Sequence, residues 1–169
     1  AFTSPSVRQF APQCWMPLAH AEAMRSHPDL ALQALADVDP AMLARAAEMY
    51  GVSRTYGDPL RLLAEVHPAL IGVATRTVGR AAIIEHAVKA GVRALHVEKP
   101  LCNSMRELRV LEELFASGNH FLTYGTIRRF LRPYRAAVEC VRSGCLGALL
   151  EVQVNMGRGA LYWTHPHSV

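Results

Sequence analysis

Two short segments of the sequence combine residue types that can carry out chemistry on a small polar molecule. The first is Glu98-Lys99-Pro100, which follows the largely apolar run 92–97. A carboxylate and an ammonium group directly after a buried strand can face a ligand, because open α/β sheets bind ligands beyond the carboxyl ends of their strands. The proline fixes the turn, and a Lys-Pro bond is one of the few that can be cis. On spacing alone, a surface loop with two solvated charges is an equally good interpretation.

The second segment is His165-Pro166-His167, which follows the aromatic pair Tyr162-Trp163. Imidazole exchanges a proton near neutral pH, as the oxidation of an alcohol to a ketone requires. Two other interpretations stay open for these histidines. A His-x-His pair could bind the metal of a metal-dependent hydrolase, but no further ligands stand close in sequence, and we expect no metal site. The pair could also be purely structural.

The landmarks around the first segment occur in an order that resembles the Gfo/Idh/MocA family of nicotinamide-dependent oxidoreductases. Ala74-Thr75 ends an apolar strand, Ala90-Gly91 ends the next helix, and Glu98-Lys99-Pro100 follows the next strand. The match continues through Tyr-Gly-Thr-Ile-Arg-Arg-Phe at 124–130 and Ser-Gly-Cys-Leu-Gly at 143–147. Five linked landmarks in order are far more specific than a lone tripeptide.

This resemblance implies an α/β fold, a Rossmann-type doubly wound parallel sheet followed by the start of an α+β substrate domain. We expect the Rossmann domain at residues 1–123 and an incomplete second domain at 124–169, so that the chain could be a fragment. The implied activity is NAD-dependent hydride transfer between nicotinamide and a hydroxyl or carbonyl group of a sugar, cyclitol or similar polyol. The implied assembly is a homo-oligomer formed through the C-terminal sheet.

The resemblance also assigns roles to individual residues. Lys99 lies beside the reacting carbon and the nicotinamide, so that it also contacts the cofactor, and it hydrogen-bonds the substrate hydroxyl, which favours a developing alkoxide. Glu98 faces the nicotinamide ribose, and His167 transfers the proton, although Trp163 stands where the family has an orienting aspartate. The remaining expected contacts are Ala74, Thr75 and Arg76 with the cofactor, and Tyr124, Arg128 and His165 with the substrate. For Tyr124 and Arg128, a packing or surface role is an equal alternative.

Two arginines, Arg76 and Arg80, stand where the family usually has a proline and a histidine. An arginine at a strand end can approach a phosphate or a carboxylate. A solvated arginine in the first turn of a helix is the alternative interpretation.

An acidic residue at the end of the second strand of a Rossmann unit binds the adenosine ribose hydroxyls. Asp37 follows the strand candidate 30–36, and Val38 offers no cation for a 2′-phosphate, so we expect NAD rather than NADP. Asp39 precedes Pro40 and is expected to cap the next helix; Asp37 as a second capping residue is the alternative to the ribose role.

The N-terminal segment departs most from the family. A dinucleotide-binding turn needs glycines, but no glycine occurs before Gly51. If His20 aligns with the family's histidine after that turn, Pro12, Cys14 and Pro17 fall near the expected glycines. A non-catalytic binding or regulatory relative that has lost this loop is therefore the second functional hypothesis.

Alternating strand and helix patterns predict a parallel α/β sheet. Strands are expected at 7–10, 30–36, around Tyr56, and at 70–75, 92–97, 121–124 and 149–154. Helices are expected at 17–26, 41–50, 58–65, between 75 and 90, and at 105–116 and 131–142, the last with an apolar side.

Composition excludes several classes of protein. The chain has 169 residues, 51% of them hydrophobic and 19% charged, which suits a globular core. Its apolar runs are shorter than the roughly 18 residues of a membrane helix, and residues 1–6 lack a secretory pattern. The net charge of +4 is scattered; its densest group, Arg128-Arg129-Arg132-Arg135, suits a solvated helix face, so we expect no nucleic-acid binding. The four cysteines lack Cys-x-x-Cys spacing, which indicates reduced thiols and a cytoplasmic protein.

Overall fold

The computed structural model describes residues 17–154 of the chain. It divides the chain into two compact units, residues 1–126 and 127–169. The first unit contains the strands β1 (Ala34–Ala36), β2 (Arg54–Tyr56), β3 (Leu70–Val73), β4 (Ala94–Val97) and β5 (Phe121–Tyr124). Its helices are α2 (His20–Ser26), α3 (Pro40–Tyr50), α4 (Pro59–Val66), α5 (Arg80–Lys89) and α6 (Met105–Phe115). The second unit contains the short 3₁₀ helix η2 (Ile127–Phe130) and the helix α7 (Arg132–Arg142).

All strand pairs in the described residues are parallel. β1 pairs with β2, and β3, β4 and β5 form a second sheet in that order. In the Rossmann order 3-2-1-4-5-6, these two sheets occupy positions 3-2 and 4-5-6. The strand expected at residues 7–10 for the remaining position lies outside the described residues.

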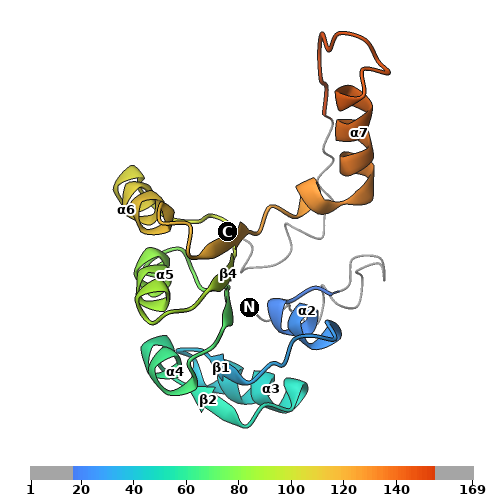
Figure 1. Cartoon of the computed structure of the whole chain (residues 1–169). Coiled ribbons are helices and arrows are strands. Elements are labelled where there is room, and N and C mark those ends of the chain that lie inside the picture. Colours follow the sequence, from blue (N-terminus) through green and yellow to red (C-terminus); the bar gives the residue numbers. More distant parts are fainter. Residues whose placement is uncertain (1–16, 155–169) are drawn as a thin grey trace. The chain divides into compact units, whose positions relative to one another are not determined.

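Helices lie on both faces of the strands, as a doubly wound fold requires. Figure 1 shows α4, α5 and α6 on one side and α2 and α3 on the other. The parallel α/β class expected from the alternating pattern and the Rossmann-type sheet implied by the family resemblance are therefore both confirmed.

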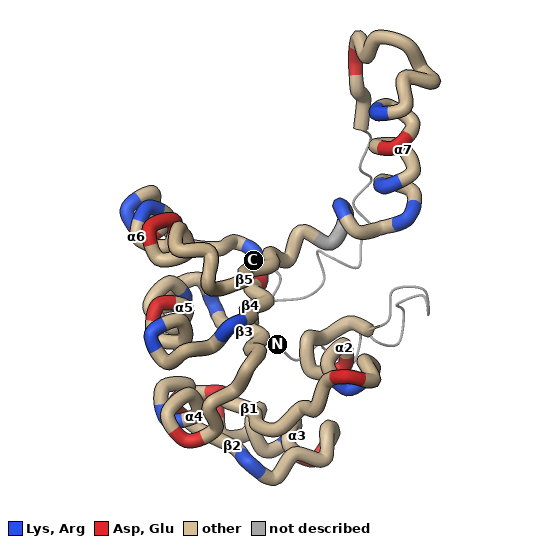
Figure 2. The backbone as a smooth tube through the Cα atoms, viewed as in Figure 1, with Lys and Arg blue, Asp and Glu red and all other residues tan. Residues whose placement is uncertain are grey.

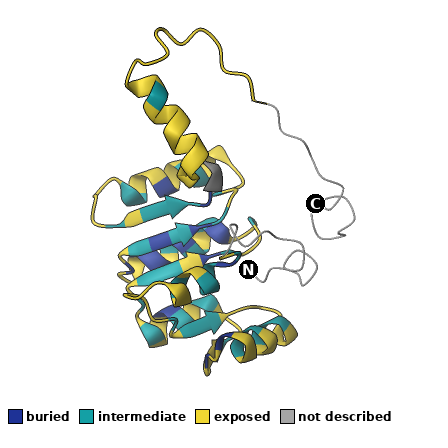
Figure 3. Cartoon of the chain, turned by 90° about the vertical axis from the view of Figure 1, so that its right-hand side faces the viewer, coloured by how far each residue is buried: buried dark blue, intermediate teal, exposed yellow. Residues whose placement is uncertain are grey.

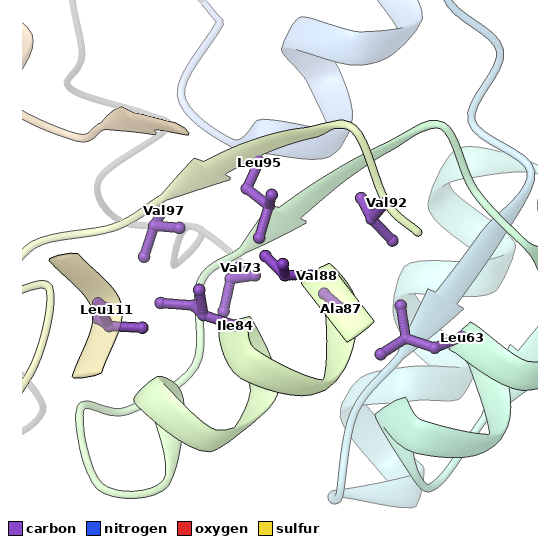
Figure 4. Close-up of a cluster of buried hydrophobic side chains, with 9 residues drawn as sticks. All are labelled: Leu63, Val73, Ile84, Ala87, Val88, Val92, Leu95, Val97 and Leu111. Carbon is purple, nitrogen blue, oxygen red and sulfur yellow. The ribbon is translucent and has the colours of Figure 1, made fainter. Parts of the chain in front are cut away.

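The main core lies between the β3–β4–β5 sheet and the helices α4, α5 and α6 (Figure 4). Ile84 in α5 is completely buried and packs with Val73 and Val97, which are neighbours in the sheet register. Figure 3 shows buried residues concentrated in the strands and along the helix sides that face them. This packing holds the ends of β3 and β4 rigidly beside each other.

Local capping explains where three of the helices begin. The side chains of Asp39, Asp58 and Ser104 each accept a main-chain N–H from the first turn of α3, α4 and α6, at 2.9, 2.8 and 3.1 Å. Such a cap typically contributes about 1 kcal/mol. The cap expected of Asp39 is confirmed, and Ser104 is the residue that caps α6.

Two expected strands differ from those observed. In the segment 30–36 only Ala34–Ala36 is a strand. The segment 149–154 is not a strand, and its apolar side chains are exposed, Leu150 to 95%. A strand needs a hydrogen-bonded neighbour, and the described part of the chain supplies none to this segment. Apolar composition alone predicted it wrongly.

The expected apolar side of the 131–142 segment is present on α7 but exposed. Leu131, Tyr134, Val138 and Val141 are each between 38% and 49% exposed. Figure 2 shows basic and acidic residues mixed along the outer helices α4, α5 and α6. Among the described residues, no helix combines the length and apolar character that a bilayer crossing demands.

Candidate functional site

The carboxyl ends of β3, β4 and β5 lie side by side and carry the expected site residues. The register pairs Val73 with Val97 and Val97 with Tyr124. Two main-chain hydrogen bonds continue the ladder beyond the strands, from Glu98 N–H to the Val73 carbonyl at 2.9 Å and from Gly125 N–H to the Val97 carbonyl at 2.8 Å. This edge is where open α/β sheets bind their ligands.

Glu98 lies at the centre of this edge, where two polar groups hold its carboxylate and Gly125 leaves room for it. Its Oε1 lies 3.3 Å from Nε2 of His20, and its Oε2 accepts the main-chain N–H of Lys99 at 3.1 Å. A Cβ added to Gly125 would lie only 3.1 Å from Oε2 and 3.3 Å from the Cα of Glu98. Glycine at position 125 therefore gives the carboxylate the space it occupies.

His20, which the resemblance aligned with the family's histidine after the dinucleotide turn but to which no role was assigned, is a residue of this site. Its ring lies over Gly72 of β3 and makes an edge-to-face contact with His96 of β4, with ring centroids 4.5 Å apart. Burial and the nearby His96 lower the pKa of His20, while its hydrogen bond to Glu98 opposes that shift. Its Nδ1 is buried without a partner among the described residues. The imidazole is thus disposed to stay neutral.

The alternation of β4 and β5 side chains separates two faces of this edge. His96 and Thr123, joined by a 2.7 Å hydrogen bond, share the face that His20 covers. Tyr124 is one position further along β5, in the row of Val73 and Val97 that belongs to the hydrophobic core. The structure therefore places Tyr124 on the opposite face of the sheet from His20.

The turn after β4 carries Lys99. Lys99 and Pro100 are exposed, and the peptide bond between them is cis, an option that the X-Pro sequence left open. The side chain of Lys99 is thus accessible to a ligand at the sheet edge.

Arg80 does not have either of the roles considered for it. It is the first residue of α5 and only 3% exposed, so it is not a solvated arginine. Its Nη1 donates to the carbonyl oxygens of Glu98, at 2.6 Å, and of Pro100, and its Nη2 donates to the carbonyl oxygen of Thr75. It binds main-chain oxygens at the ends of both β3 and β4, and is directed inward rather than at a ligand phosphate.

The residues after β3 remain available to a ligand. Ala74 is half-buried, whereas Thr75 and Arg76 are exposed. The hydroxyl of Thr75 donates to the carbonyl oxygen of Arg76 at 3.0 Å, which shapes the loop locally. These residues lie at the same sheet edge as Glu98.

Asp37 follows β1, at the carboxyl edge of the other described sheet. Its N–H donates to the Tyr56 carbonyl, and its Oδ1 accepts the N–H of Asp39 at 2.9 Å. The residue is exposed, and Oδ1 is its only carboxylate oxygen with a hydrogen bond within residues 17–154. A ribose hydroxyl can therefore reach Oδ2.

The start of α2 has its own carboxylate. The side chain of Glu22 accepts the main-chain N–H groups of Leu18, at 2.8 Å, and Ala19, at 3.3 Å. These amides precede a helix of seven residues. Donors that a Rossmann fold commonly directs at a pyrophosphate are engaged here with the chain's own carboxylate.

Three expected site residues cannot be placed. His165 and His167 lie outside the described residues, and of Arg128 only its position in η2 is described. Within the described residues, the structure forms no group of three or more His, Cys, Asp or Glu side chains that could hold a metal ion.

Comparisons with known proteins agree with this geometry. Residues 15–126 match the Gfo/Idh/MocA family, described as an oxidoreductase family with a NAD-binding Rossmann fold. The chain is 27% identical over 128 residues to a myo-inositol 2-dehydrogenase of Thermotoga maritima, covering 76% of this chain and 38% of that protein. It is 25% identical over 116 residues to a D-apiose dehydrogenase of Rhizobium rhizogenes, covering 69% of this chain and 33% of that protein.

A solved structure shows the same fold. The scyllo-inositol dehydrogenase of Lactobacillus casei, with bound NAD(H) and scyllo-inositol, superposes with a TM-score of 0.71 at 25% identity, covering 76% of this chain and 38% of that one. The chain thus spans less than two fifths of the length of these relatives. Because the family match covers most of the chain and includes the edge built around Glu98, this chain belongs to the Gfo/Idh/MocA oxidoreductases with a NAD-binding Rossmann fold.

Proposed function

We propose that this chain is the cofactor-binding part of a NAD-dependent dehydrogenase that transfers a hydride between nicotinamide and a hydroxyl or carbonyl carbon of a cyclitol, sugar or similar polyol. The observation that carries the proposal is the sheet edge itself. Thr75, Glu98 and Gly125 follow three adjacent parallel strands, and Lys99 lies exposed in the turn beside them. Both polar side chains of the Glu98-Lys99 pair are accessible where such sheets bind ligands.

The described residues fit NAD at two points. The exposed carboxylate of Asp37 has an oxygen available for the adenosine ribose, and Val38 beside it provides no charge for a 2′-phosphate. At the other end, Gly125 leaves room for the Glu98 carboxylate, the group that we assign to the nicotinamide ribose. We assign Asp37, Ala74, Thr75, Arg76 and Glu98 to cofactor binding.

The residues of the chain would orient the substrate and the cofactor and would take the proton from the substrate hydroxyl. NAD, when bound, supplies the hydride acceptor or donor. Lys99 would donate a hydrogen bond to the substrate oxygen and stabilise the negative charge that develops on it. His167 would take the proton from that hydroxyl, with His165 and Arg128 as substrate contacts. Tyr124, in the row of the core residues Val73 and Val97, has the packing role that the sequence left open. Glu98, held by His20 and the Lys99 N–H, would bind the nicotinamide ribose.

The substrate class rests on the relatives. Two of them are named for inositols and one for apiose, which are all small molecules rich in hydroxyl groups. A cationic side chain at the reacting oxygen suits a neutral polyol, whose alkoxide it stabilises. We extend this proposal to the whole protein, as a homo-oligomer joined through the part that follows the Rossmann domain.

Two observations favour a second candidate, a binding or regulatory relative that does not turn over substrate. The sequence has no glycine before Gly51, and Glu22 engages the amides of Leu18 and Ala19 at the start of α2. A carboxylate at that place disfavours a pyrophosphate by like-charge repulsion.

Titration of the full protein with NADH, followed by cofactor fluorescence, separates the two candidates. The dehydrogenase proposal expects saturable binding of NADH and weaker binding of NADPH. Asp37→Ala should weaken NADH binding about 10- to 100-fold, because a hydrogen bond to a charged group contributes roughly 1.5–3 kcal/mol. Arg109→Ala, an exposed substitution on α6, is the control. No fluorescence change at millimolar NADH would favour the binding protein.

Turnover then tests Lys99. In an assay with NAD⁺ and myo-inositol, Lys99→Ala should lower kcat about 10²- to 10³-fold while leaving the Kd for NADH nearly unchanged. Equal losses in kcat and in cofactor affinity would remove Lys99 from the chemical step and leave it a binding residue.

A further inference from the structure

The side chain of Arg80 connects the two strand ends that the proposed site depends on. Its guanidinium lies between the carbonyl oxygen of Thr75, after β3, and the carbonyl oxygens of Glu98 and Pro100, after β4. Those last two carbonyls belong to the residues on either side of Lys99. One planar group therefore fixes the main chain both before and after the exposed lysine.

Because the Arg80 side chain is buried, its guanidinium needs these hydrogen bonds to main-chain carbonyls. Arg80 is 3% exposed, and among the described residues no carboxylate pairs with it. A buried cation without a counter-ion is stable only if oxygen dipoles replace the lost water. Here three carbonyl oxygens take that role, and its Nε has no partner in the described part. The guanidinium and the turn 98–101 therefore hold each other in place.

The shape of the guanidinium group makes arginine better suited to position 80 than histidine or lysine. Arginine presents N–H donors on three nitrogens in one rigid plane, so it can bind carbonyls of two different strands at once. The histidine that the family resemblance expects here has two ring nitrogens and can serve at most two of the three carbonyls. Lysine has a single nitrogen on a flexible stem.

The fold delivers this side chain to the strand ends through the start of α5. Gly79 adopts a positive φ of 77° as the N-cap residue, and the N–H of Arg80 donates to the Thr77 carbonyl at 3.1 Å. The helix then packs Ile84 into the core below β3 and β4. Arg80 is thereby held at the base of the turn with little freedom to leave.

We propose that Arg80 is the positioning residue of Lys99: by binding the carbonyls of Thr75, Glu98 and Pro100, it fixes the turn that presents the lysine at the sheet edge. Its role in turnover rests on the proposed dehydrogenase function. Its role in holding the turn does not, because the contacts are within the chain itself.

Hydrogen exchange of the full protein tests whether Arg80 holds the turn that carries Lys99. In Arg80→Gln, amide exchange in peptides covering 97–102 should accelerate about 10- to 100-fold, while peptides from β1 and α3 keep their wild-type rates. Arg80→Lys retains the charge and most of the apolar stem, and should accelerate the same peptides because it lacks the fork. Arg109→Gln, an exposed arginine on α6, should change neither. If Arg80→Gln does not fold, Arg80→Lys decides the matter.

Kinetics with NAD⁺ and myo-inositol test whether this positioning of Lys99 matters for turnover. Both Arg80 variants should lower kcat about 10- to 100-fold, since a displacement of about 1 Å in a reacting group costs that much, and leave KM within about threefold. With Arg80→Ala, added guanidinium chloride at millimolar concentration should restore part of kcat, which a general loss of stability would not allow.

Unchanged exchange in 97–102, or equally faster exchange throughout the protein, would overturn the proposal. If the wild-type protein neither binds NADH nor oxidises myo-inositol, the dehydrogenase function fails while the exchange result still decides whether Arg80 holds the turn.

Discussion

Gly125→Ala places a methyl group against the carboxylate at the centre of the site. The new Cβ would lie 3.1 Å from Oε2, 3.2 Å from Cδ and 3.3 Å from Cα of Glu98. Ordinary carbon contacts are about 3.5–4.0 Å, so either Glu98 or β5 must shift by several tenths of an ångström. The Cα belongs to the main chain, and the carboxylate is held from its other side by His20 at 3.3 Å. Neither can yield without losing a contact.

The expected loss of stability follows from this geometry. Overpacking of this kind typically costs about 1–3 kcal/mol. For a chain of this size, about 2–4 °C of Tm is lost per kcal/mol, so Tm should fall by roughly 2–12 °C. The matched control is Gly57→Ala: an added Cβ there would meet nothing within 4 Å, and no positive φ is found at that glycine. That variant should keep or slightly raise Tm.

A double-mutant cycle assigns the effect to Glu98. Glu98→Ala removes the Cδ and Oε2 atoms that the new methyl group would meet, so Gly125→Ala should cost about 1–2 kcal/mol less in that background. The assay is thermal unfolding followed by circular dichroism, with NADH titration of each folded variant. A Gly125→Ala protein as stable as wild type, or an identical cost in both backgrounds, would refute the close packing inferred here.

Three further outcomes follow from the described contacts. The pKa of His20 in the folded protein lies below its ordinary value of 6.5, so the unfolded chain binds the proton first and Tm should fall as the pH drops below about 6.5. Thermal unfolding at several pH values should show a smaller fall in Tm for His20→Gln, but an unchanged fall for His86→Gln, which replaces an exposed histidine. Asp39→Ala removes the cap of α3 and should lower the free energy of unfolding by about 1 kcal/mol in urea titrations, with an unchanged m-value. Ile84→Ala leaves a cavity at a completely buried position, and the same titration should show a loss of about 2–5 kcal/mol; a loss below 1 kcal/mol would show that α5 does not pack on the sheet as described.

Much of the first unit could be predicted because its signals are local. Asp39-Pro40, Asp58-Pro59 and Ser104 begin helices through contacts within three residues of the chain. Apolar runs of four to six residues between these helices indicated the parallel strands, and the ends of those strands indicated the edge where Glu98 and Lys99 lie. Here the order of local elements is sufficient, because right-handed strand–helix–strand connections allow few arrangements.

The partners of those residues depended on packing between distant segments. His20 and Glu98 are separated by 78 positions, and nothing in the pattern around either residue indicates their contact. The burial of Arg80 could likewise not be predicted from the sequence, because an arginine in the first turn of a helix is usually solvated. The strand predicted at 149–154 was wrong for a related reason: β-structure needs a partner that the segment itself does not contain.

The sequence by itself determined the fold class, the helix starts and the sheet edge that carries Glu98, Lys99 and Pro100, since these follow from propensities and connections that act over a few residues. Only the tertiary structure decided that His20 and Gly125 enclose the Glu98 carboxylate and that Arg80 lies buried under the turn. Contacts of that kind depend on how α2, α5 and β5 pack against one another. The desolvation of a charge decides whether Arg80 must bind main-chain carbonyls, and a few tenths of an ångström decide whether the Glu98 carboxylate fits beside position 125.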